Sequence, residues 1–87
     1  MDGRTRVARN LRRIRSAQGI SQEALAIDAN VDRTYVSGIE RRVFNPTVDI
    51  LDRLADALSI DVSELFNKLD NADPEPSSLR SGRRSSK

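Results

Sequence analysis

The sequence predicts an all-α fold of five short helices. Apolar residues recur every three to four positions along most of the chain, which is the period of a helix with one buried face. No segment alternates apolar and polar residues as a strand does. Four helix starts share one pattern, a capping hydroxyl or carboxyl side chain with an apolar residue four positions later. The capping residues of these starts are Ser21, Asp32, Thr47 and Asp61.

The helices follow from these starts. The first is expected at about residues 4–18 and the second at about 22–28, and three more begin after the caps at 32, 47 and 61. Helical spacing predicts which residues face the core. The predicted inward residues of the first four helices are Val7, Leu11, Ile14, Ala17, Leu25, Ala26, Val36, Ile39, Leu51, Leu54, Ala55 and Leu58.

The chain divides into a folded part and a tail. Residues 1–69 hold nearly all of the large apolar side chains and are expected to form one domain. Residues 70–87 are rich in Ser, Pro and Arg, so they cannot bury enough surface to offset the entropy of ordering, and a disordered basic tail is expected. The arginines of the tail either are simply solvated or add weak attraction to phosphate.

Composition excludes several classes of function. The chain has no cysteine and no histidine, which removes the usual nucleophile, general base and metal ligands. Because the acids fall on caps and outer helix faces and no glycine-rich phosphate loop is present, an enzyme is the least expected class, and no cofactor or metal is expected. No apolar run approaches a bilayer span, so no membrane partner and a cytoplasmic location are expected.

Charge is distributed unevenly along the chain, although the net charge is only +2. Residues 1–20 carry six arginines and one aspartate, whereas residues 46–73 carry two basic residues and seven acids. A body with one basic end suits a partner with a dense negative surface, such as the phosphate backbone of DNA. Well-solvated arginine-rich helices are the alternative interpretation.

The second and third helices are joined by a turn of only a few residues, 29–32. Asn30 suits the left-handed conformation that ends a helix sharply. Ala26 supplies the small side chain that a close helix crossing requires. These spacings predict a helix-turn-helix at the second and third helices, whose second helix lies in the major groove of DNA.

The outer face of the third helix carries the candidate DNA-binding residues. With Val36 and Ile39 inward, this face and its flanks hold no acid, whereas a merely solvated face would tolerate acids. Arginine can bond guanine, and hydroxyl groups can bond bases or phosphates. Gly38 costs about 1 kcal/mol in a helix interior, which a close approach of DNA would justify. The residues concerned are Arg33, Thr34, Tyr35, Ser37, Gly38, Arg41 and Arg42.

Two charged residues lie at the edges of the predicted inward faces. Glu40 is next to the inward phase of the third helix, and Arg15 has the corresponding position on the first. We expect them to form an ion pair that ties the third helix to the first.

The motifs resemble those of a known family. Four motifs carry the likeness. They are Leu-Arg-x-x-Arg at 11–15, Gly-Ile-Ser-Gln-x-x-Leu-Ala at 19–26, Asp-Arg-Thr-Tyr-Val-Ser-Gly-Ile-Glu-Arg at 32–41 and Asn-Pro-Thr at 45–47. From residue 11 to about 69 the chain resembles the phage repressor and Cro-like (XRE-type) helix-turn-helix family, which has the lambda-repressor-like fold. Within that family it is most similar to the controller proteins of restriction-modification systems.

The resemblance implies a homodimeric transcription regulator, a repressor or controller, that binds double-stranded DNA at an operator with two-fold symmetry. It implies that Gln22 opens the second helix beside the DNA backbone and that the residues at 33, 34, 35 and 37 contact bases or phosphates. It also implies the pairing of Arg15 with Glu40. The chain departs from the family pattern at Asn30 and Arg42, where glycine is more usual.

The acidic second half is the expected dimer surface, because it should lie away from DNA. The apolar stripe of the fifth helix provides it, and its members are Val62, Leu65, Phe66 and Leu69. We expect Phe66 and Leu69 to face the partner. No small-molecule ligand is expected, since there is no room for a sensing domain.

Two alternatives stay open. The regulator could serve a phage or another mobile element instead of a restriction-modification system. The fold could also be a protein-interaction module, such as an antiactivator or antitoxin, that does not bind DNA sequence-specifically.

Overall fold

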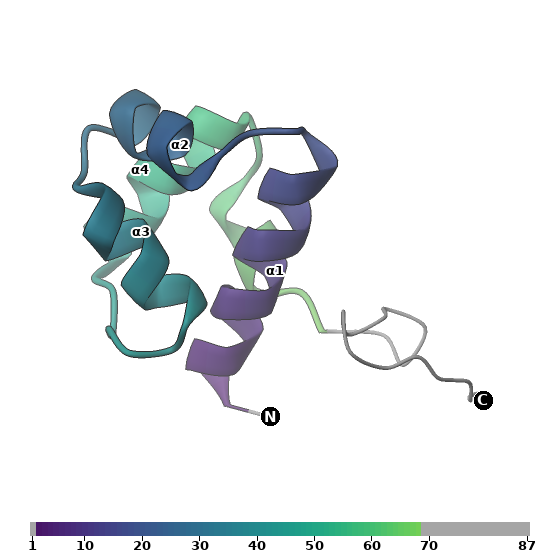
Figure 1. Cartoon of the computed structure of the whole chain (residues 1–87). Coiled ribbons are helices and arrows are strands. Elements are labelled where there is room, and N and C mark those ends of the chain that lie inside the picture. The colour runs from purple at the N-terminus through teal and green to yellow at the C-terminus, as the bar shows by residue number, and fades with distance from the viewer. Residues whose placement is uncertain (1, 69–87) are drawn as a thin grey trace, which may run out of the picture.

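Four α-helices and a short 3-10 helix make up the fold, in a computed structural model that describes residues 2–68. Figure 1 shows them wrapped around one another, with α4 behind α2 and α3. The helices are α1 (Gly3–Ala17), α2 (Gln22–Ala29), α3 (Arg33–Glu40), α4 (Val48–Leu58) and the 3-10 helix η1 (Val62–Phe66). Residues 2–68 contain no strand, so the prediction of an all-helical fold is confirmed. No helix in this range is long and apolar enough to cross a membrane.

The prediction of a fifth α-helix is wrong, because η1 is a 3-10 helix of five residues. An α-helix at this position would need the carbonyl of Leu65 for a later amide of its own backbone. That carbonyl instead accepts a hydrogen bond from Nδ2 of Asn10 at 3.1 Å, and the carbonyl of Asn67 accepts a second at 2.9 Å. The side chain of a buried α1 residue therefore ends the segment after one turn and a half.

Most helix starts are capped as predicted. Ser21 Oγ accepts from the amide of Ala24 at 3.0 Å, and Thr47 Oγ1 accepts from that of Ile50 at 3.1 Å. Asp61 accepts from the amide of Ser63 at 3.0 Å, and hydrogen bonding by the hydroxyl group and then the amide of Ser63 lowers the pKa of its carboxyl group. Asp32 starts α3 without a side-chain hydrogen bond, so the cap expected there is absent.

Every α-helix ends in the same way. A residue in the left-handed conformation follows the helix, and the next amide donates to the carbonyl five residues earlier, which is the Schellman motif. The four left-handed residues are Gly19, Asn30, Arg42 and Ser59, with φ of 70°, 61°, 63° and 60°. The four closing bonds, 2.8 to 3.1 Å long, run from Ile20, Val31, Val43 and Ile60. The left-handed conformation predicted for Asn30 is confirmed.

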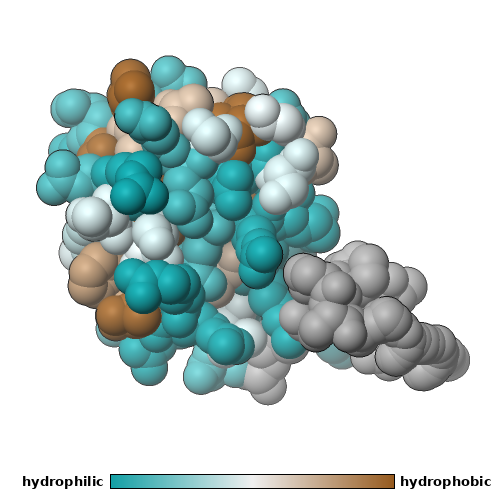
Figure 2. Space-filling view, in the orientation of Figure 1, coloured by the Kyte–Doolittle hydropathy of each residue, from teal (hydrophilic) through white to brown (hydrophobic). Residues whose placement is uncertain are grey.

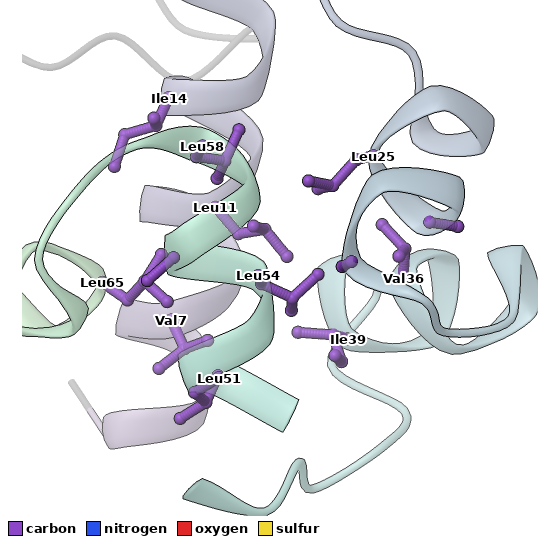
Figure 3. Packing of buried hydrophobic residues seen from close by; sticks show 13 residues of the cluster. Val7, Leu11, Ile14, Leu25, Val36, Ile39, Leu51, Leu54, Leu58 and Leu65 are labelled. Atoms are coloured by element: carbon purple, nitrogen blue, oxygen red, sulfur yellow. The ribbon is translucent and has the colours of Figure 1, made fainter. Parts of the chain in front are cut away.

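The core lies where α1, α2, α3 and α4 face one another, and Figure 3 shows the side chains converging from both sides. All the predicted inward residues are buried except Ala17, the last residue of α1, which is exposed. Ala8, Ala29 and Leu65 complete the apolar core. Asn10 is buried with them, and its side-chain amide donates a hydrogen bond to the carbonyl of Leu65 in η1.

Two of the left-handed residues carry a side chain that disfavours that conformation, Arg42 and Ser59. Because a Cβ at positive φ crowds the following carbonyl, Arg42→Gly and Ser59→Gly should each stabilise the fold by about 1 kcal/mol. Asn30→Gly should gain less, since Asn tolerates this conformation. Urea unfolding followed by circular dichroism measures the three changes; a loss of stability at both positions would contradict the assigned strain.

Candidate nucleic-acid interface

The outer side of α3 presents basic and hydroxyl side chains. Arg33 and Thr34 are exposed on its first turn, and Arg41 follows its last residue. The Nε of Arg41 donates to Ser37 Oγ at 3.3 Å, so this guanidinium lies along the helix, and Ser37 is half-buried beneath it. In Figure 2 the face that carries α1 and α3 is largely hydrophilic, with isolated hydrophobic residues.

The one acid of α3 is withdrawn from this surface. Glu40 forms the expected ion pair with Arg15, with Nε to Oε2 at 2.7 Å and Nη2 to Oε1 at 3.0 Å. The side chains are 4% and 14% exposed, respectively. A two-pronged geometry of this kind is the strongest form of the arginine–carboxylate contact. The pair leaves the outer face of α3 without an exposed negative charge.

Two further hydrogen bonds extend the pair to α2. Gln22, on the first turn of α2, donates from Nε2 to Glu40 Oε1 at 3.0 Å, and Arg15 donates from Nη1 to the carbonyl of Ile20 at 2.8 Å. The hydrogen bond to Glu40 raises the pKa of Arg15 above its ordinary value, against the opposite effect of burial. Gln22 thus lies half-buried at the edge of the interface, with its amide directed to Glu40 instead of outward.

Gly38 does not have the place that the sequence analysis gave it. It is buried, and a Cβ added there would lie 2.2 Å from Cδ2 of Phe44. The glycine therefore makes room for an aromatic ring of the same chain, and the expectation that it lets DNA approach is corrected. A costly glycine inside a helix, followed six residues later by an aromatic residue, is the signal that could have suggested this contact.

Tyr35 and Arg42 lie beside this ring. Tyr35 is half-buried, and its ring centroid is 5.3 Å from that of Phe44, with the planes tilted by 50°. Arg42 is exposed in the left-handed position after α3, where the family usually has glycine. Its side chain starts from a fixed backbone turn next to the exposed end of α3.

The residues expected at the dimer surface separate into three groups. Leu65 is fully buried in the core, so its assignment to a dimer surface is corrected: a 3-10 helix has three residues per turn, and this directs Leu65 inward with Val62. Val62 is half-buried, whereas Phe66 is 43% exposed. Leu69 and the tail at 70–87 lie outside the described residues.

Sequence reasoning missed two residues that organise the site, Phe44 and Asn10. Asn10 joins α1 to the end of η1 and accepts from Nη2 of Arg13 at 2.9 Å. Its signal in the sequence is a polar residue within the apolar stripe of the first helix.

Comparison with known proteins places this geometry in a family. A model of the helix-turn-helix family, HTH_3, matches residues 11–65, which include α2, α3 and their short turn. The chain belongs to the helix-turn-helix family. The resemblance to phage repressors and restriction-modification controllers is thereby confirmed at the level of the family.

Three relatives illustrate the likeness. The control protein C.SmaI of Serratia marcescens is 37% identical over 68 residues, covering 78% of this chain and 81% of that protein. The immunity repressor protein of Bacillus phage phi105 is 37% identical over 62 residues, covering 71% of this chain and 43% of the repressor. The crystal structure of the restriction-modification controller protein C.AhdI from Aeromonas hydrophila superposes with a TM-score of 0.71 at 41% identity, covering 72% of this chain and 96% of that one.

Some relatives are longer than the matched region. The chain spans 61% of a hypothetical transcription factor of Neisseria meningitidis, to which it is 39% identical over 65 residues and 75% of its own length. The crystal structure of the hypothetical transcription factor NHTF from Neisseria matches with a TM-score of 0.73 at 38% identity, covering 76% of each chain.

Removal of the buried carboxylate should be costly. Glu40→Ala leaves the guanidinium of Arg15 buried without its partner, which typically costs about 3–5 kcal/mol of unfolding free energy. Asp49→Ala is the matched control, because it breaks an exposed ion pair with Arg53 at 3.4 Å. That loss should stay below about 1 kcal/mol. Urea unfolding of both variants at neutral pH compares them, and equal losses would show that burial does not strengthen the Arg15–Glu40 pair.

Proposed function

We propose that this protein is a sequence-specific transcription regulator that binds double-stranded DNA by inserting α3 into the major groove. The observation that carries the proposal is the outer side of α3: Arg33 and Thr34 are exposed there, while Glu40, the one acid of the helix, is buried against Arg15. A helix that hides its negative charge and displays arginine and hydroxyl groups has the chemistry that reads base edges.

The roles of the residues follow from their positions. Arg33 opens α3 and can bond O6 and N7 of a guanine with two hydrogen bonds, and Thr34 beside it can bond a base or touch a thymine methyl group. Ser37 and Tyr35, half-buried on the flanks, are placed for single contacts to bases or phosphates. Arg41 and Arg42, exposed at the other end of α3, are placed for contacts to the phosphate backbone.

Regulation as the outcome of binding is supported by the relatives. C.SmaI and C.AhdI are named as control proteins, and the phage phi105 relative is named as an immunity repressor. The chain covers most of the length of the two controllers and less than half of the repressor. We therefore propose regulation by a small controller-like protein, with a phage or mobile-element regulator as the nearest variant of the same activity.

Sequence-specific binding by so short a recognition helix requires two copies of the protein. One α3 covers only a few base pairs, and related folds place two recognition helices about one helical turn apart on a two-fold symmetric operator. The acidic residues of α4, Asp49, Asp52 and Asp56, are exposed and would be repelled by phosphates, so this side should lie away from DNA. Phe66, exposed at the end of η1, marks the proposed dimer surface, with Val62 at its edge. Leu69, which lies outside the described residues, is kept as a proposed member from the sequence alone.

The first test concerns base reading. Arg33→Ala should weaken binding to the preferred site by about 1–3 kcal/mol and relax the sequence preference at one base pair. Arg53→Ala is the control, since Arg53 lies on α4 and pairs with Asp49. Sites selected from random duplexes, followed by titration of preferred and random DNA with each variant, supply the measurement.

Two results would overturn this assignment. An equal loss on preferred and random DNA would make Arg33 a phosphate contact and not a base contact. If the unaltered protein shows no preference for any duplex, the alternative of a protein-interaction module with the same fold replaces the proposal.

The second test concerns the dimer. Phe66→Glu should shift the protein toward monomer without unfolding it, because Phe66 is 43% exposed, and should weaken binding to a symmetric site. Ile27→Glu is the control for association, since Ile27 is 72% exposed on α2. Sedimentation equilibrium at tens of micromolar measures association. A chain that stays monomeric and binds a single half-site as tightly as a full palindrome would contradict the dimeric architecture.

A further inference from the structure

We propose that Phe44 is a positioning residue for DNA recognition: its ring, packed on Gly38, holds the ring of Tyr35 in place at the recognition helix. The proposal rests on the proposed function, because it assigns to Tyr35 a place in the DNA interface. Phe44 itself belongs to the connection between α3 and α4, residues 41–47, and not to the helix that reads DNA.

The ring of Phe44 occupies space that only a glycine leaves open. A Cβ at position 38 would lie 2.2, 2.5 and 2.9 Å from three atoms of the ring, Cδ2, Cε2 and Cγ. The ring therefore rests directly on the backbone of α3. Since a glycine inside a helix lowers its stability by about 1 kcal/mol relative to alanine, the contact with Phe44 gives this glycine a physical reason.

The backbone holds the ring at the same point. The amides of Val43 and Phe44 both donate to the carbonyl of Gly38, at 2.8 and 3.2 Å. The left-handed turn at Arg42 directs the chain back onto α3 and makes these two bonds possible. Gly38 thus contacts the following segment in two ways: the ring of Phe44 fills the space that a side chain would occupy, and the carbonyl of Gly38 accepts the two hydrogen bonds.

The ring of Tyr35 also packs against the ring of Phe44. The two rings have centroids 5.3 Å apart with a tilt of 50°, a geometry in the favourable range for aromatic pairs. Tyr35 is one residue before Val36 on α3 and three before Gly38, so the ring, the glycine and Phe44 form one continuous cluster. Tyr35 is half-buried, so packing against Phe44 and the core restricts the orientation of its ring.

This arrangement gives Phe44 an effect on DNA binding without a contact to DNA. If its ring is removed, Tyr35 gains freedom, and part of the binding free energy is then used to order it again. An aromatic pair of this kind corresponds to a two- to tenfold change in an equilibrium constant, roughly. Phe44→Ala should therefore weaken binding to the preferred site about two- to tenfold, whereas binding to random DNA changes little.

The free protein offers a direct measurement. Tyr35 is the single tyrosine and the chain has no tryptophan, so tyrosine fluorescence reports on this ring alone. In Phe44→Ala a fast local depolarisation should appear in the anisotropy decay. Gly38→Ala should produce the same effect, because the new Cβ displaces the ring of Phe44. Val48→Ala, which truncates an apolar side chain that is 71% exposed on α4, is the control and should leave the decay unchanged.

Binding completes the test through a double-mutant cycle. Once Tyr35→Ala has removed the positioned ring, Phe44→Ala should cause no additional loss on the preferred site. Phe44→Tyr keeps an aromatic ring at position 44 and should restore binding. Helicity measured by circular dichroism verifies that each variant is folded before it is compared.

Each result bears on the proposal separately from the proposed function. An unchanged anisotropy decay in both Phe44→Ala and Gly38→Ala overturns the positioning of Tyr35, whatever DNA binding shows. Increased motion with equal losses on preferred and random DNA reduces Phe44 to a stabilising residue and overturns its part in recognition. If the unaltered protein shows no preference for any duplex, it is the proposed function that fails, and the anisotropy result still decides whether Phe44 holds Tyr35.

Discussion

The buried ion pair between Arg15 and Glu40 is the contact on which the arrangement of the first three helices depends. It joins the last turn of α1 to the last residue of α3, and Gln22 and the carbonyl of Ile20 bring the start of α2 into the same network. The pair also removes the negative charge of Glu40 from the outer side of α3. One contact therefore sets both the relative placement of the helices and the electrostatic character of the surface that we propose for DNA.

Local signals predicted much of the fold. The capping side chains at Ser21 and Thr47 and the left-handed turn at Asn30 depend on residues only a few positions away, so the sequence alone was enough to place them. The helical phase that put Val36 and Ile39 inward also separated the two sides of α3 correctly. Arg15 and Glu40 could be matched because each sits at the edge of an apolar stripe.

The features that were missed depend on contacts with residues outside the helix concerned. The 3-10 form of η1 follows from the side chain of Asn10, more than fifty positions earlier. The role of Gly38 follows from Phe44, which folds back only because Arg42 adopts a conformation that sequence patterns do not assign to arginine. Both errors arise where a tertiary contact decides what a local preference leaves open.

The short corners of this fold restrict how the length of the chain can change. At residues 19–21 and 59–61 a left-handed residue, an apolar residue and a capping residue follow one another, and each has a fixed task. One added residue would rotate the next helix by about 100° about its axis and turn its apolar face outward. The connection at 41–47 is longer, and its exposed part beyond Phe44 has room for change. Insertions and deletions that preserve the domain should therefore concentrate between Phe44 and the start of α4. The other corners should keep their length in every variant that retains the fold.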